Sequence, residues 1–128
     1  MTQRTPITAE DAPAAAGPYS HAVRHGDVLY CSGSIPLDPE TNEIVGSSLA
    51  EETERCLRNL EAVCAAAGTE LANTLRATIY TTDLGGFGEI NAAYEKFFPS
   101  APPARVTVGV SALPKGARVE IDAIVSAG

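Results

Sequence analysis

Two charged residues near the C-terminus, Arg105 and Glu120, could together act on a small carboxylic acid. An arginine guanidinium binds both oxygens of a carboxylate through parallel N–H donors. A glutamate can take a proton from water and return it to a leaving group when its pKa lies near neutral, a condition that partial burial favours. If both side chains face one pocket, the arginine would hold an anionic substrate while the glutamate moves a proton at its reacting carbon.

The elements that must position these residues are two alternating runs, residues 105–110 and 118–125, on either side of the turn-rich stretch 111–116. This pattern predicts a β-hairpin. Its apolar face carries Val106, Val108, Val110, Val119, Ile121, Ala123 and Val125, and its polar face carries Arg105, Thr107, Arg118, Glu120 and Asp122. Arg105 and Glu120 are therefore expected on the same side. A second interpretation stays open, in which the polar face is solvated and held by cross-strand ion pairs.

The length and composition predict one globular domain spanning residues 1–128, and the order of the elements given below predicts an α+β fold. Hydrophobic residues make up 45% of the chain and charged residues 20%, which is typical of a folded domain with a core. The net charge is −7 and no cluster of Lys or Arg is present, so a nucleic-acid partner is not expected. The sequence has neither the apolar run of a signal peptide nor a segment long enough to span a bilayer. We therefore expect a cytoplasmic protein without a membrane partner.

The cysteines and histidines do not predict a metal site. Cys56 and Cys64 lie on the apolar stripe of a predicted helix and are expected in the core, while Cys31 lies in a predicted strand. The three cysteines include no C-x-x-C spacing. A cluster of His21, His25 and Cys31 would lack a fourth ligand.

Two amphipathic helices are predicted. The first begins with a capping box at Ser48 and Glu51 and ends at Gly68. Its solvated side is expected to carry Glu52, Glu54, Arg55, Arg58 and Glu61. The second runs over residues 87–98 and stops before Pro99. Its buried stripe is expected to contain Phe87, Ile90, Tyr94, Phe97 and Phe98.

Further strands are predicted over residues 3–9, 21–24, 28–33 and 74–82. In the last of these, Leu75, Ala77 and Ile79 are expected on one side, and Arg76, Thr78 and Tyr80 on the other. The resulting order is β-β-β-α-β-α-β-β, which predicts a mixed sheet with both helices packed on one face. The other face would carry the polar side chains of strand 74–82 and of the hairpin, either exposed to water or buried against another subunit.

Seven short segments, in order along the chain, give a resemblance to a known family. They are APAAAGPYS (12–20), SGSIP (32–36), NL (59–60) with AAG (66–68), YTTDL (80–84), INAAY (90–94) with FF (97–98), PAR (103–105), and LPK (113–115) leading into VEI (119–121). The chain resembles the Rid family, the reactive intermediate (enamine/imine) deaminases. The resemblance implies a chorismate-mutase-like fold and a homotrimer with ligand sites in clefts between subunits. It also implies hydrolysis of 2-imino acids and their enamine tautomers, such as 2-aminoacrylate and 2-aminocrotonate, to 2-oxo acids and ammonia, without a metal or organic cofactor.

The resemblance also assigns roles by position. Arg105 matches the arginine that binds the substrate carboxylate, and Glu120 matches the glutamate that positions or activates water. The matching residues around the ligand are Tyr19, Ser32, Gly33 and Asn91.

The chain departs from the family pattern at two places. Thr107 stands where many family members have cysteine, so a mechanism that needs that thiol is not expected. Pro102 replaces a frequent aromatic residue, and the segment between Phe98 and Pro102 is shortened. The preferred imine is therefore left open.

Two other functional classes remain as alternatives. Some family members are described as endoribonucleases or translation inhibitors, but the acidic balance of this chain disfavours RNA binding. The other alternative is a non-catalytic binder of small carboxylates, a sensor or a redox-activated chaperone-like protein, in which Arg105 holds a ligand without turnover.

Overall fold

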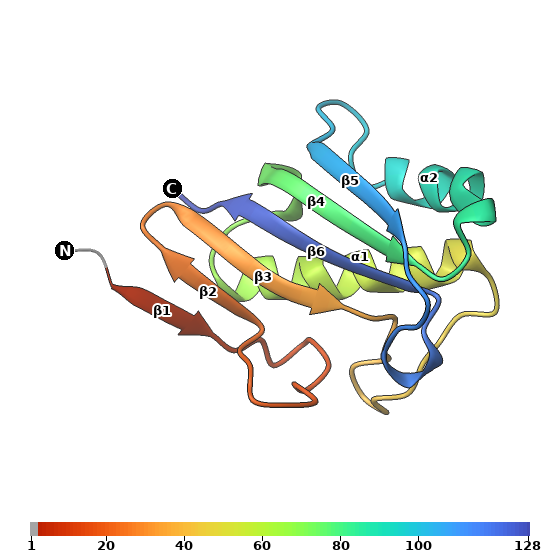
Figure 1. Ribbon diagram of the computed structural model, residues 1–128. Coiled ribbons are helices and arrows are strands. Elements are labelled where there is room, and N and C mark those ends of the chain that lie inside the picture. The colour runs from red at the N-terminus through yellow and green to blue at the C-terminus, as the bar shows by residue number, and fades with distance from the viewer. Residues whose placement is uncertain (1–2) are drawn as a thin grey trace.

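The computed structural model describes residues 3–128 as a twisted six-stranded sheet with both helices on one side of it (Figure 1). The strands are β1 (Arg4–Ile7), β2 (Ala22–His25), β3 (Val28–Ser34), β4 (Thr74–Thr81), β5 (Ala104–Gly109) and β6 (Val119–Ser126). The helices are α1 (Leu49–Ala66) and α2 (Phe87–Glu95). The predicted order of elements and the packing of both helices on one face are confirmed.

The last two strands do not form the predicted hairpin. The strand order is β1-β2-β3-β6-β4-β5, so β4 lies between β5 and β6. β5 pairs with β4 in parallel because α2 returns the chain to the starting end of the sheet, and β6 then pairs with β4 antiparallel. The stretch 111–116 contains a short 3₁₀ turn, Pro114–Gly116, and crosses the end of β4. Alternation and turn residues predicted both strands correctly but could not identify their partners.

This topology separates Arg105 from Glu120. In the β4–β5 register Arg105 lies beside the buried Ala77, so it shares the helix-covered face of the sheet. On β6 the buried residues are Val119 and Ile121, so Glu120 points to the open face. The prediction that Arg105 and Glu120 share one face is therefore wrong for a single subunit.

The neighbours of these two residues follow the same division. Thr107 accompanies Arg105 on the helix side, while Asp122 accompanies Glu120 on the open side. Val106 and Val108 were expected in the core, but they point to the open face and are 44% and 37% exposed.

Helix α1 begins and ends where the sequence predicts. The Glu51 N–H donates to Ser48 Oγ at 3.1 Å, which satisfies one free donor of the first turn. Gly68 follows the helix with φ +78°, and Thr69 N donates back to Cys64 O at 2.9 Å. Glycine adopts this left-handed conformation without strain, so it ends the helix.

One residue on the predicted solvated side of α1 is instead buried. Glu52 is 2% exposed, and its carboxylate accepts hydrogen bonds from Arg118 N at 2.8 Å and Arg118 Nε at 2.6 Å. This contact also removes Arg118 from the polar sheet face on which it was predicted. A buried carboxylate needs such a partner, and the partner is 66 residues away in the chain, so local periodicity could not show it.

Two further hydrophobic side chains that were predicted to be on the buried side are exposed, each for a local reason. Leu75 is 50% exposed because the β4–β6 register shifts between Thr74 and Arg76, which moves Leu75 off the buried side. Phe87, predicted in the buried stripe of α2, is 39% exposed at the beginning of the helix. Ile90 and Tyr94 are buried as expected.

The predicted core cysteines are confirmed, since Cys56 and Cys64 are fully buried and Cys31 lies buried in β3.

Within residues 3–128, no helix has the length and apolar character needed to cross a membrane.

Candidate functional site

The first half of the candidate site surrounds Arg105 at the edge of the sheet. The guanidinium carbon of Arg105 lies 4.9 Å from the ring centroid of Tyr94 and 5.5 Å from that of Phe87. Both rings belong to α2, so the helix fixes the direction of the cation through cation–π contacts. In the described part of the chain Arg105 has no carboxylate partner, and its N–H donors are available to an external anion.

Three polar atoms on α2 and β5, the two elements that hold this arginine, have unused hydrogen-bonding capacity. Asn91 Oδ1, Tyr94 OH and Thr107 Oγ1 are buried and have no partner among the described residues. Desolvation raises the pKa of Tyr94, while the charge of Arg105 lowers it to a smaller extent, so the phenol remains a hydrogen-bond donor at neutral pH. A cleft of about 570 Å³ opens here, lined by Leu84, Phe87, Arg105 and Thr107. We call these residues, with Asn91 and Tyr94, the arginine half-site.

The second half of the candidate site surrounds Glu120 on the open face. The Glu120 carboxylate lies directly against Gly33, where a Cβ atom would be 3.0 Å from Glu120 Cδ and closer still to Oε2. The β3–β6 register shifts between Cys31 and Ser34, and this irregularity brings the backbone of Gly33 under the carboxylate. A side chain at position 33 would therefore require the Glu120 carboxylate to move.

The environment of Glu120 suits proton transfer. Burial raises the pKa of its carboxyl group above the usual range, and the negative charge of Asp122 raises it further. A cleft of about 300 Å³ in front of Glu120 is lined by Ala16, Tyr19, Gly33, Ile35, Leu37, Pro114 and Lys115. We call Tyr19, Ser32, Gly33 and Glu120 the glutamate half-site.

The loop that carries Tyr19 is held by its neighbours. His21 Nδ1 accepts a hydrogen bond from Ala9 N at 2.9 Å, and its Nε2 donates to Pro13 O at 2.8 Å. Because Nδ1 is the acceptor, the ring is in its neutral Nε2–H form in this arrangement. Ser32 Oγ donates to Ser20 O at 2.6 Å, so the hydroxyl of Ser32 is used to anchor this loop.

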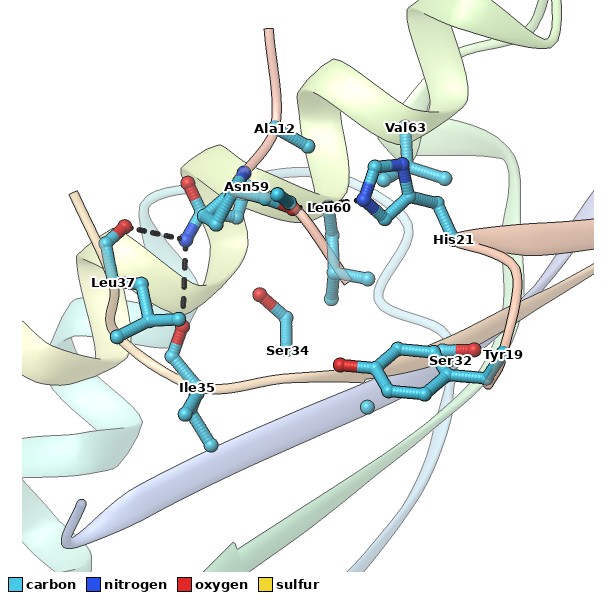
Figure 2. Close-up of a pocket in the computed structure, with 13 residues that line it drawn as sticks. Ala12, Tyr19, His21, Ser32, Ser34, Ile35, Leu37, Asn59, Leu60 and Val63 are labelled. Carbon is cyan, nitrogen blue, oxygen red and sulfur yellow. Dashed lines mark hydrogen bonds between the residues drawn. The ribbon is translucent and has the colours of Figure 1, made fainter. Parts of the chain in front are cut away.

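A small inner cavity of about 50 Å³ lies behind the wall of the glutamate half-site (Figure 2). Tyr19, Gly33, Ile35 and Leu37 line both the cavity and the cleft of Glu120. Asn59 of α1 holds this wall, because its Nδ2 donates to Leu37 O at 2.9 Å and to Ile35 O at 3.4 Å (Figure 2). Buried amides that bind backbone carbonyls fix a loop in one conformation. Asn59 therefore connects α1 to the glutamate half-site.

Comparison with known proteins identifies the family. Residues 9–127 match the model of the family described as Endoribonuclease L-PSP. The chain belongs to this family, the Rid family. This Rid chain is 50% identical over 121 residues to the RutC family protein y4sK of Sinorhizobium fredii, covering 94% of the chain and 96% of that protein. It is 40% identical over 125 residues to the mouse 2-iminobutanoate/2-iminopropanoate deaminase, covering 98% and 93%.

The fold of the Rid chain is the predicted chorismate-mutase-like α+β fold. The crystal structure of Escherichia coli TdcF with bound serine is similar to it with a TM-score of 0.91 at 34% identity, covering 97% of this chain and 99% of that one.

The structure divides the predicted site residues into two groups. Arg105 and Thr107 line the arginine cleft, and Asn91 lies on α2 with Phe87 and Tyr94. Tyr19, Gly33 and Glu120 line the glutamate cleft, whereas Ser32 lines the inner cavity and anchors Ser20. Phe87 and Tyr94 were predicted only as core residues, so their contact with Arg105 was missed. Their helical spacing indicated a shared face but not that an arginine from β5 would cover it. Among residues 3–128, no three His, Cys, Asp or Glu side chains gather closely enough to hold a metal ion.

Proposed function

We propose that this chain hydrolyses small 2-imino acids and their enamine tautomers, such as 2-aminoacrylate and 2-aminocrotonate, to 2-oxo acids and ammonia. The sites lie between the subunits of a homotrimer. Arg105 of one subunit binds the substrate carboxylate, and Glu120 of its neighbour activates water. Asn91 and Thr107 complete the first side of the site, and Tyr19, Ser32 and Gly33 complete the second.

The observation that carries this proposal is the position of the two half-sites on opposite faces of one sheet. The Arg105 side chain lies on β5, the edge strand of the sheet, and is held there by its contact with Tyr94 of α2. Glu120 lies on the open face of the sheet, on β6. One subunit cannot bring both to the same substrate, but a second copy placed on the open face can. The open face also exposes Tyr30, Val106 and Val108, which is apolar surface that a neighbouring subunit would cover. The name of the mouse relative supports the same reaction.

The first step is binding and orientation of the substrate. Arg105 forms two N–H···O bonds to the carboxylate, which places the adjacent C=N carbon against the facing glutamate half-site. The two aromatic rings of α2 limit the movement of the guanidinium, so the substrate carbon is held in one place. An enamine first takes a proton from solvent at its β-carbon and becomes the protonated imine, which is the form that water attacks.

The second step is addition of water and loss of ammonia. Glu120 takes one proton from water as the oxygen bonds to C2, and the C=N electron pair moves to nitrogen, which gives a carbinolamine. Glu120 then returns the proton to nitrogen. As the C–N bond breaks, the hydroxyl O–H bond breaks to form C=O, Glu120 takes the hydroxyl proton and passes it to solvent, and the 2-oxo acid and ammonia leave. The raised pKa of Glu120 suits a group that must both accept and donate a proton near neutral pH. Imines hydrolyse in water without help, so these steps need neither a covalent nucleophile nor a cofactor.

Ammonia release from freshly generated imine tests the proposal. A pyridoxal-phosphate enzyme acting on serine or threonine supplies 2-aminoacrylate or 2-aminocrotonate, and imine decay and ammonia are followed with and without the Rid chain. We expect faster decay and one ammonia per 2-oxo acid, with Arg105→Lys and Glu120→Gln greatly reduced. Decay at the spontaneous rate would contradict the proposal. Light scattering is expected to give a trimer, and a monomer mass at micromolar concentration would contradict the shared site.

One observation favours a non-catalytic binder as the second candidate. The aromatic clamp around Arg105 is complete within one subunit and does not require Glu120. A sensor of this kind would bind 2-oxobutanoate and show no turnover of imine. Calorimetry with 2-oxobutanoate beside the imine assay separates the two functions. An RNA substrate is disfavoured by the net charge of −7.

A further inference from the structure

The open face beside Glu120 carries a second carboxylate whose position is fixed. Glu120 and Asp122 alternate with buried residues on β6 and therefore share the open face. In the β4–β6 register Tyr80 lies directly opposite Glu120, and Thr78 lies opposite Asp122. The Tyr80 hydroxyl donates to Asp122 Oδ2 at 2.9 Å, diagonally across the two strands. Tyr80 thereby fixes the Asp122 carboxylate next to Glu120.

The nearby cationic side chains are hydrogen-bonded to groups other than Glu120 and Asp122. Within residues 3–128 neither Glu120 nor Asp122 takes part in an ion pair. Arg118, two residues before Glu120, is bound to Glu52. Lys115 lines the cleft of Glu120, but its ammonium donates to the carbonyl of Asn42 at 3.1 Å.

The remaining polar groups around Glu120 come from three other elements. Arg76 lies further along β4, opposite Ile124, and is exposed. The loop contributes the phenol of Tyr19, and β3 contributes the backbone of Gly33. Two carboxylates therefore lie two residues apart on one strand face, and neither has an ion-pair partner among residues 3–128.

We propose that Asp122, held by Tyr80, is a positioning residue whose fixed negative charge opposes the ionisation of Glu120 and so makes the Glu120 carboxylate a stronger base toward water. This inference rests on the proposed function, because the proton concerned is the one that Glu120 takes from water and returns to the leaving nitrogen. The charge of Asp122 is the second cause, after burial, of the raised pKa of Glu120. The hydrogen bond to Asp122 also raises the pKa of Tyr80, so the phenol stays protonated and continues to hold Asp122.

Three substitutions separate the charge of Asp122 from its structural role. Asp122→Asn removes the charge and keeps the shape and an oxygen that accepts from Tyr80. Tyr80→Phe removes the restraint and keeps the charge. Glu61→Gln is the matched control, since it removes one carboxylate from the exposed side of α1, where Glu61 pairs with Arg58. All three are prepared as full-length chains, and folding is checked by circular dichroism.

The experiment measures the titration of Glu120 in two ways. The first is the pH profile of kcat for imine hydrolysis, and the second is the ¹³C-carboxyl NMR titration of Glu120, assigned by its loss in Glu120→Gln. In Asp122→Asn, we expect the part of the kcat profile that follows the ionisation of Glu120 to move to lower pH. The midpoint of the Glu120 NMR titration should move in the same direction, because a like charge no longer opposes the ionisation of Glu120. Tyr80→Phe should move both quantities to lower pH by less than Asp122→Asn, because the charge remains but is no longer held beside Glu120, and Glu61→Gln should leave both unchanged.

An unchanged NMR midpoint in Asp122→Asn would overturn the inference, and so would an equal shift in Glu61→Gln. The NMR measurement does not depend on turnover. If the wild-type chain fails to hydrolyse imine, the proposed function fails while the coupling of Asp122 to Glu120 is still decided.

Discussion

Mixing two inactive variants should restore activity if each site takes Arg105 from one subunit and Glu120 from another. Arg105→Lys replaces a two-pronged donor by a point charge, and the lost charge-assisted hydrogen bond costs about 1.5–3 kcal/mol, or roughly 10- to 150-fold in kcat/KM. Glu120→Gln keeps the shape of the side chain but cannot accept a proton, so kcat should fall on the order of 10²-fold or more. Each variant alone is therefore expected to be nearly inactive.

The size of the restored activity follows from the geometry of a closed ring. The half-sites lie on opposite faces of each sheet, so every site would combine the arginine half-site of one subunit with the glutamate half-site of the next. In a random mixture of the two variants, half of the subunits carry the intact arginine and half the intact glutamate. About one quarter of the sites then contain both intact residues, so about a quarter of wild-type activity should return.

The assay unfolds both variants together in denaturant, refolds them at equal concentrations and measures ammonia release from 2-aminoacrylate. The controls are each variant refolded alone, and both mixed after folding without denaturant, which should stay nearly inactive while subunits do not exchange. Activity that remains at the level of the single variants after joint refolding, with wild-type chains recovering fully, would refute the shared site. It would mean that Arg105 of one subunit and Glu120 of another do not act on one substrate.

Three further outcomes are expected. Gly33→Ala should lower kcat strongly while the chain still folds, because the added Cβ meets the Glu120 carboxylate; steady-state kinetics checks this, and unchanged kcat would contradict the contact. Glu52→Gln should lower the free energy of unfolding by about 2 kcal/mol through loss of a charged acceptor for Arg118, whereas the exposed Glu54→Gln should change it by less than about 0.5 kcal/mol in the same denaturant titration. Glu120→Gln should raise the melting temperature at pH 7, because a carboxyl whose pKa is raised by folding opposes folding once pH exceeds its unfolded value. That advantage should disappear below the unfolded pKa, and a lower melting temperature at pH 7 would contradict the sign.

The sequence by itself determined the features that depend on neighbours along the chain. Ser48 and Gly68 marked the ends of α1 correctly because a cap and a left-handed C′ residue satisfy backbone groups within one turn. The alternation of Val119 to Val125 identified the buried face of β6 because side chains of a strand alternate regardless of its partners. The seven family segments likewise led to the correct fold and family before any strand partner was known.

Only the tertiary structure decided which elements meet. β4 lies between β5 and β6, so Arg105 faces α2 and Glu120 faces the open side, although both lie in runs of the same pattern. The burial of Glu52 against Arg118 was likewise decided by a contact 66 residues apart. Alternation specifies that a strand has two faces, but the choice of which face is covered depends on strand pairing. Pairing is set by the total burial and hydrogen bonding of the sheet, and no single segment contains that information.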